Sequence, residues 1–470
     1  MNLRISIGLL GCLWLVAWGQ PEETLAGLTR EQLEQRKVQL KEQSNQLMSL
    51  WAGHWRVVEE WRKQPLIQSD LPQPSVAREM LLVRIESIRR VDAEVLRYYP
   101  DSPQGFPYYE LQARVVKTWA SRLYVHSRAV VLPLRAGMTL SLLWIGCKKD
   151  EQGYEVPAPL IWETGKEYLI RLGFPFVKAL RDSPEWGAFW DNPSLDKLWL
   201  VIGGGDCWFG ILGSRGGGSV YNIVPGPPWT GNEARVLRMP WSPAMRIEEP
   251  SAELLRVLDE ESAYYRLSDY AQRLQWAKQR VQDKSLPLWQ RQRAVLYLYL
   301  AYLRFEEEES EAFSQRLKVL YPELEYHVAR SRVRTERTIE FLTYLQGLSE
   351  PLLQAFGLRI VEVYGGLYGR DPAEVAASWV RVVERFLEAD RATEVRRSAA
   401  WVLEQKLGAL YFKESASWEW LLRYAAELRE RSEREKDEVV RVILVRAWTS
   451  LVQKDLNRQI EAIERQLRGR

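Results

Sequence analysis

The chain has 470 residues, of which 46% are hydrophobic and 27% are charged. This length exceeds that of one ordinary domain, so two or three domains are expected. Its 65 basic residues face 62 acidic ones, a formal net charge of +3, which excludes a chain-wide attraction to nucleic acid or to an anionic membrane.

The first residues have the pattern of a secretory leader. Arg4 supplies an early positive charge, an apolar run extends to about Trp18, and the sequence AWG places small residues where a signal peptidase recognises them. We therefore expect a signal peptide over residues 1–19 and a secreted or periplasmic chain. The run is shorter than the roughly 20 apolar residues that cross a bilayer, so no transmembrane helix is expected. The alternative is a lipoprotein that is lipidated at Cys12.

Residues 28–64 are predicted to form one N-terminal helix. Thr29 and Gln32 have the spacing of a capping box, in which each side chain binds the backbone N–H of the other residue. No Gly or Pro follows within the helix before Gly53. An apolar stripe runs along the expected helix at Leu33, Leu40, Leu47 and Trp51.

Over about residues 76–241 the hydrophobic period changes to two, which is typical of strands. Many short strands separated by turn signals predict a small β-barrel or sandwich. The clearest expected strands are Met80–Ile88, Tyr108–Trp119, Arg128–Leu134, Met138–Ile145 and Glu167–Gly173.

A glycine-rich stretch, residues 198–226, raises the question of a phosphate-binding loop. It lacks the Lys-Ser/Thr pair of a P-loop and the third glycine of a dinucleotide fingerprint. Glycine adopts positive φ without steric cost, so we expect a β-hairpin here.

Two motifs in the strand segment suggest a family resemblance. They are read from Val115, Val116 and Lys117 in one strand and from Gly165, Tyr168 and Leu169 in another. With them, about residues 76–175 resemble the netrin-like or tissue-inhibitor-of-metalloproteinases type of OB barrel. The resemblance implies a protein-binding or ligand-binding barrel. Those inhibitors act through a cysteine at the mature N-terminus, whereas the mature chain here would begin near Gln20, so no inhibitory residue is carried over.

Residues 250–470 have the three-to-four spacing of helices. A faint repeat of helix pairs begins at Glu350, Ala392 and Lys436, which are 42 and 44 residues apart. With this period, about residues 350–455 resemble HEAT-type repeats, which implies stacked helix pairs. A plain helical bundle is the alternative. The expected fold is therefore mixed α and β: an N-terminal helix, a small OB-like barrel and a C-terminal helical-repeat or bundle domain.

Tryptophan is abundant, with 21 residues, and several lie close together late in the strand segment. Exposed in a row, they would stack on sugar rings or on apolar groups of a partner, whereas core packing is the alternative. The candidate binding residues are Trp186, Trp190, Trp199, Trp208 and Trp229.

Cysteine and histidine are scarce. Beyond the leader only Cys147 and Cys207 remain, either as a disulfide in an oxidising compartment or as two small buried side chains. His54, His126 and His327 lie in three different segments without ligand spacing. We therefore expect neither a metal nor a cofactor.

No catalytic motif emerges from the sequence. Charge runs such as Glu433–Glu438 are interpreted as solvated helix ends. We expect an exported, non-catalytic binding or adaptor protein that engages a protein or a cell-envelope polymer through the Trp-rich barrel face or the helical-repeat surface. The alternatives are a cell-envelope glycan hydrolase with paired carboxylates in a Trp-lined cleft and a carbohydrate-binding protein.

Overall fold

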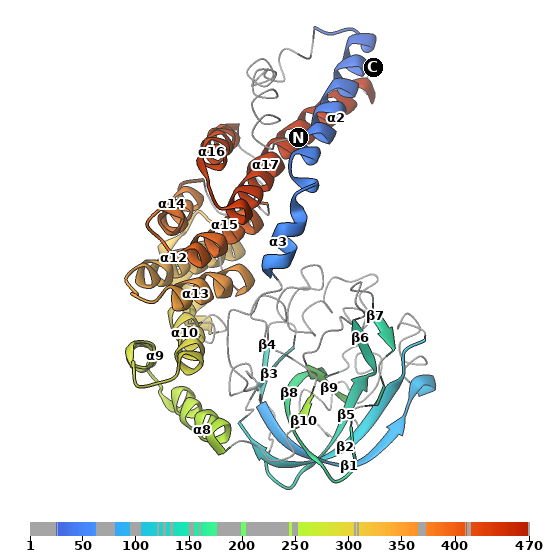
Figure 1. The fold of residues 1–470 in the computed structure, drawn as a ribbon, viewed down its shortest axis with the longest axis vertical. Helices are drawn as coiled ribbons and strands as arrows, with labels where there is room; N and C mark the ends of the chain where they lie inside the picture. The colour runs from blue at the N-terminus through green and yellow to red at the C-terminus, as the bar shows by residue number, and fades with distance from the viewer. Residues whose placement is uncertain are drawn as a thin grey trace. The chain divides into compact units, whose positions relative to one another are not determined.

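The computed structural model describes residues 25, 27–62, 80–94, 105–119, 122–125, 128–131, 135–149, 155–157, 159–160, 162–175, 199–203, 244–246, 252–304, 307, 310–364, 373–408, 410 and 415–468. The chain divides into two compact units. Pro65–Phe305 forms the mixed unit, and Met1–Gln64 together with Glu306–Arg470 forms the helical unit. The fold is thus mixed α and β with a helical C-terminal region, as expected (Figure 1).

The mixed unit is built on a six-stranded sheet in the order β1-β2-β5-β9-β8-β10. Because β1 also pairs with β8, the strands β1, β2, β5, β9 and β8 form a closed ring. Every pair is antiparallel except β5 with β9, which run parallel. The bounds are β1 Met80–Arg90, β2 Tyr108–Thr118, β5 Thr139–Ile145, β8 Glu167–Pro175, β9 Trp199–Gly203 and β10 Ala244–Arg246.

Two further pairs of short strands accompany this sheet. They are β3 Arg122–Val125 with β4 Arg128–Val131, and β6 Cys147–Lys149 with β7 Glu155–Pro157. The five strands expected from the sequence correspond to β1, β2, β4, β5 and β8.

Period-two burial explains why β2 could be recognised. In β2, Leu111, Ala113 and Val115 are at most 1% exposed, whereas the alternating Arg114 and Val116 face outward. Successive side chains of a strand point to opposite faces, so one face of β2 packs on the core.

Gly165 sets the start of β8. Its φ of +83° lies in the region that glycine adopts without strain. Its N–H donates to the Ile85 carbonyl at 2.7 Å, and the Ile85 N–H donates to the Lys166 carbonyl at 3.0 Å, which holds the turn against β1. Three residues later, the buried Tyr168 hydroxyl accepts a hydrogen bond from the Glu163 N–H at 2.8 Å.

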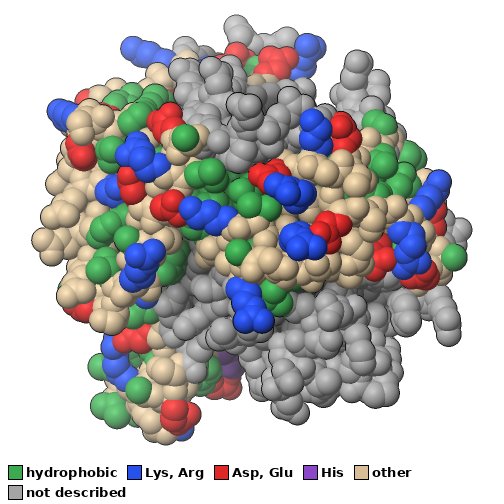
Figure 2. Space-filling view, turned by 90° about the horizontal axis from the view of Figure 1, so that it is seen from below, with side chains coloured by type: hydrophobic (Ala, Val, Ile, Leu, Met, Phe, Trp, Pro, Cys, Tyr) green, Lys and Arg blue, Asp and Glu red, His purple; other side chains and the backbone are tan. Residues whose placement is uncertain are grey.

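Ion pairs cover the outer face of the sheet. Figure 2, which views the molecule from below, shows basic and acidic side chains next to one another rather than one large field of a single sign. Such pairing agrees with the small net charge of the chain. The pairs of the outer strands include Arg84–Glu167, Arg114–Glu86 and Arg89–Glu110.

Three helices complete the mixed unit: α8 Ala252–Arg266, α9 Tyr270–Gln282 and α10 Leu288–Leu303. A buried ion pair joins α8 to α10, because Arg293 donates from Nε and Nη2 to the two oxygens of Glu261 at 2.5 Å each. Tyr297 donates to the same carboxylate at 2.9 Å. Lys117 of β2 pairs with Asp259 of α8 at 2.8 Å, which ties the helices to the sheet.

The C-terminal part of the helical unit is a succession of helix pairs. α15 packs against both α13 and α17, while α12 packs against α14. Gly357 allows α13 to approach α12 closely, since a Cβ at this position would lie 2.4 Å from the Leu345 side chain. The bounds are α11 Glu311–Leu320, α12 Tyr326–Gln346, α13 Pro351–Tyr364, α14 Ala373–Glu384, η5 Arg385–Leu387, α15 Thr393–Leu407, α16 Ser415–Arg434 and α17 Glu438–Arg468.

The N-terminal segment belongs to the same unit and forms α2 Arg30–Ala52 and α3 Trp55–Arg62. The capping box is confirmed, with the Gln32 N–H 3.2 Å from Thr29 Oγ1 and the Thr29 N–H 2.8 Å from Gln32 Oε1. The expected single helix over 28–64 was wrong, because the helix breaks at Gly53 and His54. Glycine costs about 1 kcal/mol in a helix interior, and the break starts a second helix at Trp55.

α2 packs antiparallel along α17. Contacts run in opposite directions along the two helices: Lys37 pairs with Glu464 at 2.8 Å, and Gln453 donates to the Ser44 carbonyl at 3.0 Å. The predicted stripe faces this contact, since Leu33, Leu40 and Leu47 are at most 1% exposed. The division of the chain therefore differs from the expected one: α2 and α3 join the C-terminal helices, whereas α8 to α10 join the strands.

Candidate functional site

A groove crosses the helical unit between α12, α14 and α16. Its first hollow has a volume of about 660 Å³. The floor is apolar, with Ile339, Val375 and Val380, and the walls carry Arg381 of α14 and Trp420 of α16. The groove therefore offers an apolar surface between charged rims.

A second hollow of about 670 Å³ continues this groove past the end of α14. It lies between η5, the second half of α16 and the connection to α17, and its lining includes Leu387, Arg431 and Lys436. Glu384 and Glu427 line both hollows. The two glutamates thus mark the junction at which the hollows meet, which we call the acidic junction.

One hydrogen bond spans the acidic junction. The Tyr424 hydroxyl of α16 donates to Oε1 of Glu384 on α14 at 3.2 Å. Burial, and to a lesser degree the charge of Glu427, raise the pKa of Glu384, although Arg431 and the hydrogen bond act in the opposite direction. Burial and the nearby Glu384 charge also raise the pKa of Tyr424 well above its usual range. Keeping Glu384 ionised therefore lowers the stability of the folded chain.

An aromatic pair adjoins the junction. The rings of Trp420 and Tyr424 are parallel, with an interplanar angle of 2° and centroids 5.9 Å apart. Both residues line the first hollow. Flat aromatic surfaces next to carboxylates suit the aliphatic stem and charged head of a basic side chain.

A second cluster docks α2 and α3 onto the rest of the helical unit. The rings of Trp51, Trp55, Trp401 and Trp61 form a row with centroid separations of 5.3, 6.0 and 6.4 Å. We call this the tryptophan row. Three of its members come from the N-terminal helices and one from α15, so the row joins segments that are far apart in the sequence.

Three arginines stack on the tryptophan row. The guanidinium carbons of Arg446, Arg62 and Arg359 lie 4.1, 4.2 and 4.9 Å from the nearest ring centroids. Cation–π contacts of this kind contribute about 0.5–2 kcal/mol each, more when they are desolvated. The row therefore holds the N-terminal helices with stacked charges as well as with apolar surface.

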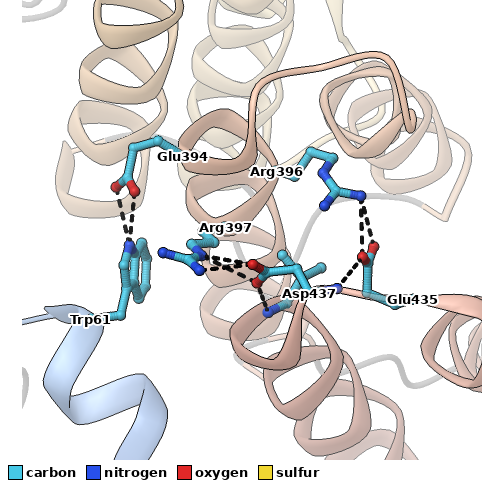
Figure 3. Close-up of polar contacts among 7 residues, drawn as sticks. Trp61, Glu394, Arg396, Arg397, Glu435 and Asp437 are labelled. Carbon is cyan, nitrogen blue, oxygen red and sulfur yellow. Dashed lines mark hydrogen bonds and ion pairs between the residues drawn. The ribbon is translucent and has the colours of Figure 1, made fainter.

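Carboxylates surround the same row. Trp61 Nε1 donates to both carboxylate oxygens of Glu394 at 3.1 Å (Figure 3), and Arg446 pairs with Glu404 at 3.1 Å. Burial raises the pKa of Glu404, and the charge of Arg446 partly offsets this. The polar groups of the cluster are thus only partly satisfied, because the indole N–H groups of Trp51 and Trp401 are buried without a hydrogen-bond partner among the described residues.

One buried charged pair beside this cluster has a long separation between its charged atoms. Arg359 and Glu362, with side chains 3% and 5% exposed, lie 3.6 Å apart. Burial lowers the pKa of Arg359 and also lowers that of the neighbouring Lys406, to about 8. Because the pair is almost completely buried between α13 and the tryptophan row, we regard the cluster as a structural device.

The start of α15 fixes the connection between α16 and α17. Arg396 pairs with Glu435 at 3.1 Å, and Arg397 pairs with Asp437 at 2.7 Å (Figure 3). Glu435 is only 8% exposed. The interpretation of the charge run Glu433–Glu438 as solvated was therefore wrong at Glu435, because Arg396 of α15 compensates its charge.

The predicted binding tryptophans lie mostly outside the described residues. Trp199 is the first residue of β9, and Trp186, Trp190, Trp208 and Trp229 lie outside. Cys147 begins β6, and Cys207 is also outside, so the disulfide stays a prediction. The groove residues were not predicted as a site. The nearest signal was Trp420, in the second helix of an expected repeat.

Histidine contributes little to the described surface. His54 lies at the break between α2 and α3, and His327 is 3.0 Å from Glu325 at the exposed start of α12. His126 is outside the described residues. Among the residues that the structure describes, no group of His, Cys, Asp and Glu has the arrangement of a metal site. No described helix is long and apolar enough to cross a membrane.

Comparisons of this chain with protein-family models, with curated proteins and with solved structures find no match.

Proposed function

We propose that this chain is an exported, non-catalytic adaptor that binds a segment of a macromolecular partner along the groove of the helical unit. The observation that carries the proposal is the adjacency of two hollows, each of more than 600 Å³, whose linings share Glu384 and Glu427 of the acidic junction. An elongated surface with an apolar floor and charged rims suits a polymer segment.

The location and the architecture are part of this proposal. The leader pattern over residues 1–19 supports export to a secreted or periplasmic location. The closed ring of strands with its parallel β5–β9 pair supports an OB-like barrel. The row α13, α15, α17 supports a HEAT-like stack. A Trp-rich barrel face remains a second binding surface, proposed from the sequence.

Site-specific crosslinking tests the binding function. A photoreactive residue replaces Ser378, which lines the groove, in cells that make the full chain. A matched probe replaces Val319 of α11, which is 80% exposed and does not line either hollow. We expect an adduct of defined mass from position 378 that is absent at 319 and is weakened by Trp420→Ala. Identical adducts at both positions, or none at 378, would contradict the proposal.

A second candidate function is hydrolysis of a cell-envelope glycan. The observation that favours it is the electrostatic coupling of two carboxylates in the groove, of which Glu384 has a raised pKa, as a general acid requires. Release of reducing ends from purified cell-wall polysaccharide tests it. Turnover that is lost in Glu384→Gln and kept in Glu419→Gln, an exposed change on α16, would establish the hydrolase instead of the adaptor.

A further inference from the structure

The acidic junction brings two carboxylates together without a compensating ion pair. Glu384 comes from α14 and Glu427 from α16. Among the described residues no ion pair joins either glutamate to a basic side chain. The charge of Arg431 favours ionised Glu384, but burial and the charge of Glu427 act against it, and the pKa of Glu384 stays raised. A positive charge placed between them would relieve this repulsion and recover the cost of burial.

The wall of the junction suits a long basic side chain. Tyr424 lies beside Glu384 through its hydrogen bond and is stacked in parallel with Trp420. Tyr424 is only 4% exposed, so the half-buried Trp420 ring supplies the surface. The methylene stem of a lysine or arginine packs on such a ring while its charged head reaches the carboxylates.

Outside the acidic junction, the charged side chains that line the first hollow are mainly basic. Its Arg332 is already paired with Glu336 at 3.1 Å. Of its remaining charged residues outside the junction, Arg381 and Arg423 are basic and Glu374 is acidic. None of these three is joined in an ion pair among the described residues, which leaves an excess of one positive charge on this side.

The second hollow repeats this pattern on the other side. Arg431 and Lys436 are basic and Glu388 is acidic, and none of them is joined in an ion pair within the described part of the chain. The remaining charged residues of this hollow, outside the junction, pair with one another. Apart from the two junction glutamates, the lining of each hollow therefore carries one more basic than acidic side chain.

We propose that the acidic junction binds a lysine or arginine side chain of an extended partner polypeptide that carries acidic residues on both sides of it. This inference rests on the proposed adaptor function and specifies its partner by charge complementarity. From Trp420 to Arg434, α16 rises about 21 Å at 1.5 Å per residue. That length matches about six residues of extended chain at 3.3 Å each.

Fluorescence anisotropy with designed peptides tests the charge pattern. The probe is a labelled, end-blocked nonapeptide with a central lysine, small apolar neighbours and two glutamates on each side. Its matched partners carry norleucine at the centre, which removes only the charge, or exchange every lysine and glutamate. We expect the norleucine peptide to bind the full chain at least 10-fold more weakly, and the exchanged peptide to bind more weakly still.

Substitutions in the groove test whether the junction glutamates cause the preference for the lysine peptide. Glu384→Gln and Glu427→Gln are each expected to abolish the difference between the lysine and norleucine peptides, whereas Glu419→Gln keeps it. Equal binding of the two peptides to the unmodified chain, preference for the exchanged peptide, or no binding of any peptide would overturn the charge assignment. In each of these cases an adduct at position 378 that depends on Trp420 would leave the adaptor function standing, so the two failures are distinguishable.

Discussion

Arg397 of α15 donates from Nε and Nη2 to the carboxylate of Asp437, with 2.7 Å between Nη2 and Oδ2. Asp437 also accepts the N–H of Val440 at 3.0 Å and thereby caps the first turn of α17. One carboxylate thus serves a helix cap and an interhelical ion pair. It holds the α16–α17 connection that forms one end of the groove.

Asp437→Asn should destabilise the helical unit at neutral pH. Asparagine is as good a helix cap as aspartate, so the change removes mainly the charge-assisted bonds, at a cost of about 2 kcal/mol. Urea unfolding at pH 7, with hydrogen exchange of α15 and α17 peptides to identify the unit, measures the loss. Asp390→Asn, an exposed change before α15, should stay within about 0.5 kcal/mol of the unmodified chain.

The same pair predicts an acid dependence. Burial opposes ionisation of Asp437, but the bonds from Arg397 and Val440 outweigh it and lower its pKa. A depressed pKa in the folded state means that the contribution is present above the ordinary value of about 3.9 and is lost as pH falls through the lower folded value. The difference between the unmodified chain and Asp437→Asn should therefore shrink below pH 4. A constant difference down to pH 2 would contradict the assignment.

The leucine stripe of α2 offers a matched pair of substitutions. Leu40 is fully buried against the helical unit, whereas Val38 on the same helix is 54% exposed. Leu40→Ala should lower the free energy of unfolding by about 3 kcal/mol, and Val38→Ala should change it by less than about 0.5 kcal/mol. Urea midpoints of the two variants check this. Similar losses for both would mean that α2 does not pack as described.

Local patterns made part of the fold predictable. The capping box at Thr29 depends on residues three apart, and the stripe at Leu33 and Leu40 depends on helical spacing, so both are visible in the sequence. The strand β2 follows from period-two burial, whereas β1 and β8 contain runs of consecutive buried residues, Met80–Val83 and Tyr168–Ile170, and were recognisable from their apolar and β-branched composition. The break at Gly53 was missed because one glycine changes a helix prediction little, although here it separates α2 from α3.

The groove was not predictable because its parts come from different helices. Glu384 and Tyr424 are 40 residues apart, and neither stands out among the charged and aromatic residues of an amphipathic helix. The same reason hid Glu435, whose partner Arg396 belongs to α15. Such pairs become visible only once the packing of the helices is known.

Arg446→Lys should loosen the N-terminal helices. Arg446 stacks on Trp55 and Trp51 at 4.1 and 4.9 Å and pairs with Glu404. Lysine keeps the charge but lacks the planar group that stacks and binds at once, so a loss of about 1 kcal/mol is expected.

Hydrogen exchange of α2 and α3 peptides in the full chain measures this loss. The control is Arg56→Lys on α3, where the side chain is 86% exposed. Faster exchange in the control than in Arg446→Lys would count against a stabilising role for the stacked arginine.

Glu384→Gln should make the helical unit more stable at pH 7. The raised pKa of Glu384 means that its contribution to stability is fully present below the ordinary value of about 4.3 and is lost as pH rises through the higher folded value. Glutamine stays neutral and still accepts the Tyr424 hydrogen bond, so it avoids this loss. Urea midpoints should therefore favour the variant at pH 7 and converge with those of the unmodified chain at pH 4, whereas Glu419→Gln should show no such trend. A variant that is less stable at pH 7 would remove the physical reason for a cation at the junction, because a carboxylate kept at a cost in stability is what a binding site, rather than a structural contact, requires.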